Sequence, residues 1–120
     1  MSRERFQIGE VVELPPDRPF RRVLVEEGDF RVAVMGLKEG VEIPEHQTPG
    51  DAALVVWSGK VLLFTEDGTA PEELGRGAIV HLPLGTRHSL RAVRDAVLLV
   101  SARLAGEATE LAASTGEERG

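Results

Sequence analysis

Short runs rich in Val, Leu and Ile recur along the chain, and each run ends at a cluster of Gly, Pro or Asp. Runs of roughly four to eight such residues between turn residues are typical of β-strands. No stretch before residue 105 repeats its apolar residues with a helical period, so the pattern predicts no helix there. The predicted strands are Gln7–Leu14, Phe20–Val25, Phe30–Leu37, Val41–His46, Ala52–Ser58, Lys60–Thr65, Ala78–Leu82, His88–Val93 and Ala96–Arg103.

The segments between these runs carry the residues that reverse a chain. Examples are Pro15-Pro16-Asp17, Thr48-Pro49-Gly50-Asp51 and Pro83-Leu84-Gly85. Proline fixes its own φ and lacks an N–H, while glycine adopts positive φ at low cost, so neither residue continues a central ladder easily. Short strands at this spacing predict an all-β fold, a sandwich or barrel of antiparallel strands.

The alternation of side chains also predicts which faces are buried. In the run that begins at Val41, the side chains of Val41 and Ile43 point to one face and that of His46 to the other. The runs Ala52–Trp57 and Val97–Leu104 are apolar on both faces. Strands that are apolar on both sides need cover from a second layer or a second subunit, so we expect a homodimer.

The C-terminal residues differ in character from the rest. Residues 105–120 are mostly Ala, Glu, Gly, Ser and Thr, with little to bury. The sequence therefore predicts one domain over residues 1–104, followed by a polar, flexible tail over 105–120.

Composition excludes several classes of partner. The chain has 120 residues, with 20 Asp and Glu against 14 Lys and Arg, a formal net charge of −6. This acidic balance argues against nucleic acid and anionic membrane surfaces as partners. The longest apolar run, Ala52–Trp57, is far shorter than the roughly 20 residues of a membrane span. The N-terminus has no apolar segment typical of a secretory signal, so the predicted location is the cytoplasm.

Three histidines are the main candidates for acid–base chemistry or metal binding, because the chain has no cysteine. His46 ends one predicted strand, His81 precedes the Pro83-Leu84-Gly85 turn, and His88 follows it. No two of them are four residues apart, so any shared site must be assembled by the fold.

Two separated blocks of the sequence follow known motif spacings. The first block has Gly40, five residues, His46-Gln47-Thr48, three residues, Ala52, six residues and Gly59. The second has Gly77, five residues, Pro83-Leu84-Gly85, two residues, His88, three residues and Ala92. In both blocks the chain resembles the cupin superfamily. The resemblance implies a small, single-domain, RmlC-like jelly-roll β-barrel of antiparallel strands.

The resemblance also implies a place for a metal ion. In metal-bearing cupins, two histidines and a carboxylate of the first motif and one histidine of the second bind a single divalent ion. Here His46 and His88 match two of these positions, while Thr48 and Ala52 occupy the other two. The implied cofactor is one divalent ion, Fe, Mn, Zn or Ni, or no metal at all. Metal sites without thiolates usually have three protein ligands. Additional ligands or pocket residues are expected among Glu42, Gln47, Thr48, Asp51 and His81, with Glu42 on the same strand face as His46 by alternation.

Other residues have a functional and a structural interpretation. Arg87 and Arg91 are candidates to bind a carboxylate or phosphate of a substrate, or they belong to a solvated face paired with Glu residues. Trp57 is a candidate for substrate stacking, or it packs in the core or in a dimer interface.

Three functional hypotheses follow from these residues and motifs. The first is a metal-dependent enzyme of the oxygenase or isomerase type that uses His46 and His88 to act on a small molecule in the barrel. The second is a ligand-binding or sensing protein that needs no metal. The third is a structural module whose interior is filled by side chains, and fold alone does not choose among the three.

Overall fold

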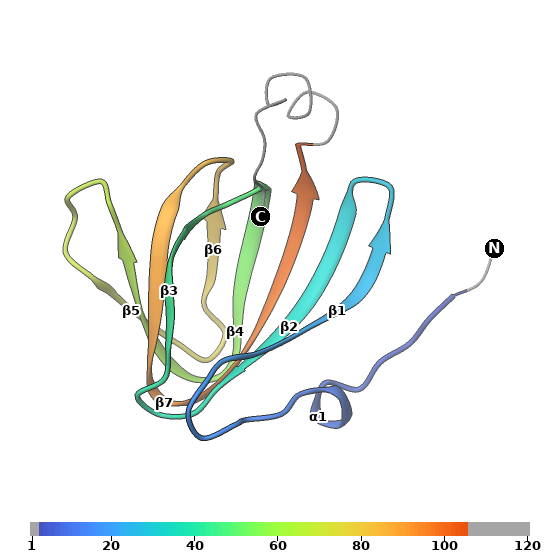
Figure 1. The fold of residues 1–120 in the computed structure, drawn as a ribbon, viewed down its shortest axis with the longest axis horizontal. Helices are drawn as coiled ribbons and strands as arrows, with labels where there is room; N and C mark the ends of the chain where they lie inside the picture. The colour runs from blue at the N-terminus through green and yellow to red at the C-terminus, as the bar shows by residue number, and fades with distance from the viewer. Residues whose placement is uncertain (1–2, 106–120) are drawn as a thin grey trace.

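The structure is a computed structural model that describes residues 3–105 (Figure 1). A single turn of helix, α1 (Ile8–Val11), precedes the strands. Seven antiparallel strands follow within the described residues: β1 (Phe20–Glu27), β2 (Phe30–Leu37), β3 (Glu42–Gln47), β4 (Gly50–Thr65), β5 (Glu72–Gly75), β6 (Ile79–Leu82) and β7 (Arg87–Leu104).

Two long strands, β4 and β7, pair along nearly their whole length and belong to both layers of the barrel. The first half of β4 and the second half of β7 lie beside β6 and β2, and β1 extends this layer beyond β2. The second half of β4 and the first half of β7 lie beside β5 and β3. Figure 1 shows the strands converging at the bottom of the view and diverging toward the top. The inner faces of the two layers enclose the core.

The bend between the layers lies where the β4–β7 register shifts, between Ser58 and Lys60. Gly59 has φ +84°, a value that side-chain-bearing residues rarely adopt. A Cβ atom at Gly59 would also meet the carbonyl oxygen of Asp95 on the facing strand. The Asp95 carboxylate accepts hydrogen bonds from the Glu39 backbone N–H at 2.9 Å and from Lys38 at 3.3 Å. The turn between β2 and β3 is thereby held at the bend.

The core is aliphatic and lies between the two inner faces. On β7 the inward positions are every second residue, and Leu90, Ala92, Ala96 and Leu98 are all buried. The other fully buried large side chains between these faces are Leu37, Leu54, Val56 and Val61, and Val34 is buried on the outer face of β2. The N-terminal segment covers part of the outer face, because a Cβ at Gly36 would meet the carbonyl of Glu13.

The predicted fold class is confirmed, and several predicted boundaries are corrected. Gln7–Leu14 is not a strand: it contains α1, and Pro15 and Pro16, which have no N–H to donate to a ladder, follow it. The prediction of no helix before residue 105 is therefore also wrong, by this single turn.

Two pairs of predicted strands are each one strand. Ala52–Ser58 and Lys60–Thr65 belong to β4, and His88–Val93 and Ala96–Arg103 belong to β7, because Gly59 and its neighbours bend the ladder without ending it. The edge strand β5 was not predicted, since its sequence Glu-Glu-Leu-Gly shows no clear alternation. The predicted tail lies outside the described residues, apart from Ala105. Within residues 3–105, no helix has the length and apolar character of a membrane span.

Candidate functional site

Two of the three histidines lie side by side. His46, near the end of β3, pairs directly with His88 at the start of β7, and cross-strand partners share a face of the sheet. The centroids of the two imidazole rings are 4.2 Å apart, with an angle of 58° between the ring planes. His88 is 6 % exposed and continues the inward row of Leu90 and Ala92, whereas His46 is exposed. The fold thus places one buried and one accessible imidazole together on the inner face.

Both rings are oriented by backbone carbonyls of their own loops. His46 Nδ1 lies 3.0 Å from the Pro44 carbonyl oxygen, and His88 Nδ1 lies 3.2 Å from that of Thr86. A carbonyl only accepts hydrogen bonds, so each Nδ1 carries the proton and donates it. In the neutral ring, each Nε2 then carries the lone pair. Within residues 3–105 neither Nε2 has a hydrogen-bond partner, so the pair offers two acceptors.

Thr48 occupies a position that is a metal ligand in metal-bearing cupins. In this structure its side chain supports the orientation of His88. Its side chain is 4 % exposed, and its hydroxyl donates to the Thr86 carbonyl oxygen at 3.1 Å. The Thr48 backbone N–H donates to the same oxygen at 3.0 Å, and the Thr48 carbonyl accepts from the Gly85 N–H at 2.8 Å. Thr48 therefore fixes the loop that holds His88, and its hydroxyl is already committed.

Burial keeps His88 neutral. Desolvation lowers the pKa of His88 below its ordinary value of 6.5, and this effect is larger than the opposing effect of the hydrogen bond to Thr86. The neighbouring His46 imidazole lowers the pKa of His88 further. At neutral pH His88 thus presents a lone pair at Nε2.

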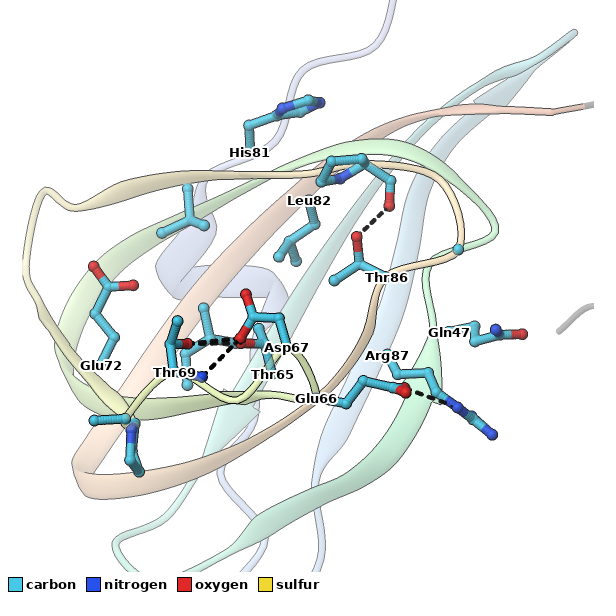
Figure 2. Close-up of a pocket in the computed structure, with 16 residues that line it drawn as sticks. Gln47, Thr65, Glu66, Asp67, Thr69, Glu72, His81, Leu82, Thr86 and Arg87 are labelled. Atoms are coloured by element: carbon cyan, nitrogen blue, oxygen red, sulfur yellow. Dashed lines mark hydrogen bonds and ion pairs between the residues drawn. The ribbon is translucent and has the colours of Figure 1, made fainter.

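A cleft of about 910 Å³ opens between the edge strands β5 and β6 (Figure 2). Inward-facing Leu63, Thr65, Val80 and Leu82 form part of its wall, and Glu72 of β5 also lines it. The loop after β4 is folded onto Asp67, whose Oδ1 accepts from Thr65 Oγ1, Thr69 Oγ1 and the Thr69 N–H at 2.9, 2.7 and 3.0 Å. Figure 2 shows this cluster at the floor of the cleft.

The cleft reaches the neighbours of the imidazole pair rather than the rings themselves. Of the predicted site residues, Gln47, His81 and Arg87 line it. Thr65, in the cleft wall, is the direct cross-strand partner of His88, and Thr86 also lines the cleft. Directly opposed residues on one face have Cβ atoms about 5 Å apart, so the pair lies one strand spacing beyond the wall.

Glu42 does not share the strand face of His46, contrary to the sequence prediction. The register of β3 against β7 shifts between Ile43 and His46, so that Glu42 pairs with the exposed Arg91 and His46 pairs with inward His88. The irregularity changes the alternation between the two positions. Glu42 therefore lies on the outer face.

His81 and Asp51 also lie away from the pair. His81 pairs with Ala53 on the outward positions of β6 and β4, and its side chain is 69 % exposed. Figure 2 shows its ring at the upper margin, apart from the other labelled side chains. Its Nε2 is 3.8 Å from Asp51 Oδ1, which accepts the Leu84 N–H at 3.1 Å. Both side chains belong to the outside of this layer.

The remaining candidates are distributed over the surface. Arg87 forms an ion pair with Glu66 at 3.0 Å, as Figure 2 shows. Arg91 lies on the outer face with its guanidinium 6.0 Å from the centre of the Phe64 ring. Trp57 is 54 % exposed on the outer face of β4, so it does not face the barrel interior. The homodimer expected from the sequence stays a prediction.

The donor set does not fit the metal that the family resemblance implies. Among residues 3–105, no group of three or more His, Asp or Glu side chains is arranged to hold a metal ion. The Thr48 hydroxyl donates to the Thr86 carbonyl oxygen, and Ala52 has a methyl group where a carboxylate would be needed. Two neutral imidazoles are one ligand short of the usual minimum.

Sequence reasoning missed several residues of the site. Thr65, Asp67, Thr69 and Glu72 lie at or beyond the end of the predicted strand Lys60–Thr65, where nothing in the local pattern marked a cleft. The Thr86 carbonyl was also missed, because a backbone acceptor leaves no signal in the sequence. One indication was available in the sequence: Asp67 precedes Thr69 by two residues, a spacing at which an Asp side chain often accepts a hydrogen bond from the backbone.

Comparison with solved structures identifies the fold. An RmlC-like cupin protein from Desulfovibrio desulfuricans is 31 % identical over 72 % of this chain and 82 % of that chain, with a TM-score of 0.65. A conserved protein of unknown function from Streptococcus pyogenes is 27 % identical over 86 % of this chain and 90 % of that one, with a TM-score of 0.69.

A double-stranded β-helix protein from Klebsiella pneumoniae shows the same fold, with 22 % identity, coverage of 88 % and 93 %, and a TM-score of 0.78. No family model matches the chain, and no curated protein matches it. The paired long strands, the two motif blocks and the similarity to the Desulfovibrio protein lead to one conclusion: the chain is a member of the cupin superfamily.

Proposed function

We propose that this protein binds a small molecule inside the barrel and does so without a resident metal ion. The observation that carries the proposal is the imidazole pair, in which both Nδ1 atoms donate to backbone carbonyls and both Nε2 atoms remain as acceptors. The side chain of His88 is buried and that of His46 is exposed, so the pair presents two oriented acceptors at the edge of the interior, an arrangement that favours a ligand with matching donors.

The chemistry of the surroundings supports a ligand rich in O–H or N–H groups. A neutral imidazole Nε2 accepts a hydrogen bond from a hydroxyl or amine. Thr65 is the cross-strand partner of His88 and its hydroxyl donates to Asp67, and the Glu72 carboxylate lines the adjoining cleft, so both side chains offer acceptors to a ligand. The cleft volume of about 910 Å³ lies within the range of roughly 300–1,000 Å³ that small-molecule sites occupy.

The donor set also supports work without a metal. His46 and His88 would be the only imidazole ligands on the inner face of the described residues, and His81 lies on the outer face. The Thr48 hydroxyl donates to the Thr86 carbonyl, and a metal contact would replace one of the hydrogen bonds that hold the loop that orients His88.

The first experiment measures metal and stability in the same sample. Tag-free protein is analysed for transition metals, and its thermal unfolding is followed with and without EDTA. We expect a metal content far below one equivalent and an unchanged Tm. One equivalent of metal that is lost in His88→Gln, together with a lower Tm in EDTA, would contradict the metal-free proposal.

The second experiment tests ligand binding by thermal shift against a panel of polyols, hydroxy acids and amines. A ligand of the pair should raise the Tm of the wild type and of Glu42→Gln, which changes a side chain on the outer face, outside the cleft. The same ligand should not raise the Tm of His88→Gln. If the ligand raises the Tm equally in both variants, the imidazole pair is not part of the binding site.

A further inference from the structure

Two arginines lie at inward positions of the barrel, on the edge strand β1 and on its neighbour β2. Arg21 pairs with Met35, which packs against the core, and Arg31 pairs with buried Ala102 of β7. Cross-strand partners share a face, so both arginines project from inward positions. A register shift between Val23 and Val25 keeps Glu26, the partner of Arg31, on the same face.

The two positive charges have a single carboxylate between them. Arg31 Nη2 binds Glu26 Oε2 at 3.0 Å. Arg31 Nε is buried and has no hydrogen-bond partner among residues 3–105. Burial, and then the neighbouring Arg31 charge, lower the pKa of Arg21, and Glu26 opposes this effect only in part. The inner face of the β1–β2 layer therefore carries an excess of one positive charge, in a chain whose formal net charge is −6.

Arg31 and the imidazole pair lie at the same end of the barrel, whereas Arg21, opposite Met35, lies closer to the bend. The turn that joins β2 to β3 is tied to Asp95 at the bend. Leu37 is the last residue of β2 before this turn, and Arg31 lies six residues before it. Val41 follows the turn, and His46 lies five residues after Val41. At about 3.3 Å per residue, both are roughly 16–20 Å from the bend. Figure 1 shows the start of β2 and the end of β3 both toward the top of the view, at the open end of the fold.

Small side chains separate the arginines from the cleft. The inward row that begins with Glu26 and Arg31 continues across the layer through Ala102 and Ala52 to Leu82, which lines the cleft. Ala52 occupies the position at which metal-bearing cupins have a carboxylate. Because the intervening side chains are short, the Arg31 guanidinium is the charged group of this row that is nearest to the cleft.

We propose that Arg21 and Arg31 form an anion subsite on the inner face of the β1–β2 layer and bind the carboxylate of the ligand. This proposal rests on the proposed function, because it names the class of ligand as a small carboxylate that also carries hydroxyl or amine donors for His46 and His88. A guanidinium presents two parallel N–H groups that match the two oxygens of a carboxylate, and such charge-assisted bonds are the strong ones.

The experiment uses acetate as the probe, with sodium chloride at equal ionic strength as the reference. The Nε–H signals of the arginines are followed by ¹⁵N NMR in the full chain during titration. We expect saturable shifts of Arg31 and Arg21 that chloride does not reproduce. Arg31→Gln and Arg21→Gln should each weaken acetate binding at least tenfold, and Arg31→Lys should weaken it as well, because lysine keeps the charge but lacks the fork.

The matched control is Arg22→Gln, which removes an exposed arginine from the outer face of the same strand and should leave acetate binding unchanged. Shifts that do not saturate, or an equal loss in Arg22→Gln, would overturn the subsite. A parallel titration with inorganic phosphate separates the two kinds of anion, and tighter binding of phosphate would overturn the assignment to a carboxylate.

The result of the acetate titration can be distinguished from the result of the test of the proposed function. Acetate has no hydroxyl or amine donor for the imidazole pair, so His88→Gln should bind acetate like the wild type. If acetate binds as predicted while no small molecule depends on His88, the subsite stands and the proposed function fails. If acetate does not bind while His88-dependent ligands are found, the proposed function stands and the subsite fails.

Discussion

Replacing Thr48 with valine removes one buried donor while keeping nearly the same shape. The Thr48 hydroxyl is 3.1 Å from the Thr86 carbonyl oxygen, and the side chain is 4 % exposed, so little water replaces the lost bond. The carbonyl keeps the Thr48 N–H at 3.0 Å and His88 Nδ1 at 3.2 Å, so it is not left without a partner. The expected loss is therefore that of a single hydrogen bond, about 1 kcal/mol of the free energy of unfolding.

The loss is measured by urea unfolding. The midpoint should fall while the dependence of the free energy on urea, the m-value, stays constant, because the same surface is exposed on unfolding. For a domain of this size, a loss of about 1 kcal/mol corresponds to a fall in Tm of roughly 4–8 °C. The matched control is Thr69→Val, which removes an exposed hydroxyl that donates to Asp67 and should change stability by less than about 0.5 kcal/mol.

Two results would refute this reasoning. If Thr48→Val unfolds at the same urea concentration as the wild type, the hydroxyl does not support the loop. If Thr69→Val loses as much stability as Thr48→Val, the effect reflects the substitution and not the buried contact with Thr86.

Three further predictions concern pH, the bend and assembly. Because the folded pKa of His88 lies below the unfolded value of about 6.5, the unfolded chain binds the proton first. Stability should thus fall as the pH drops from about 6.5 to the folded pKa, by at most about 1.4 kcal/mol per pH unit, and a urea series against pH should show a flatter curve for His88→Gln. Gly59→Ala should lose more than about 2 kcal/mol, from positive φ and the contact with the Asp95 carbonyl, whereas Gly68→Ala, with φ +88° and open space, should lose only about 1 kcal/mol in the same assay. Trp57 and Ile79 are 54 % and 70 % exposed on the outer face, so we expect a homodimer across this face that Trp57→Lys dissociates in analytical ultracentrifugation; a wild type that sediments as a monomer would contradict this.

The strands were predictable where side chains alternate or turn residues interrupt the run. The bounds of β2 match the predicted Phe30–Leu37, because turn residues interrupt the apolar run on both sides, at Gly28-Asp29 and at Lys38-Glu39-Gly40. The continuity of β4 and β7 was not predictable, because a glycine at a bend and a glycine at a turn look the same in one sequence. Which of the two applies depends on the facing strand, here Asp95 opposite Gly59.

The candidate site was predictable only in part. Motif spacing indicated that His46 and His88 belong to one site, and the structure pairs them directly. Simple alternation failed for Glu42, because the register shift within β3 cannot be read from side-chain types. The inward position of Glu26, on the same face as Arg21, depends likewise on a register shift in β1. The ring orientations depend on backbone carbonyls, which every residue has, so the sequence carries no trace of them.

The protonation of the ring nitrogens tests the account most directly. Long-range ¹H–¹⁵N NMR spectra at neutral pH distinguish a protonated Nδ1 from a protonated Nε2 in each imidazole. The contacts with the Pro44 and Thr86 carbonyls predict that His46 and His88 both carry the proton on Nδ1. A proton on Nε2 of either ring would show that the pair does not offer two acceptors to a ligand.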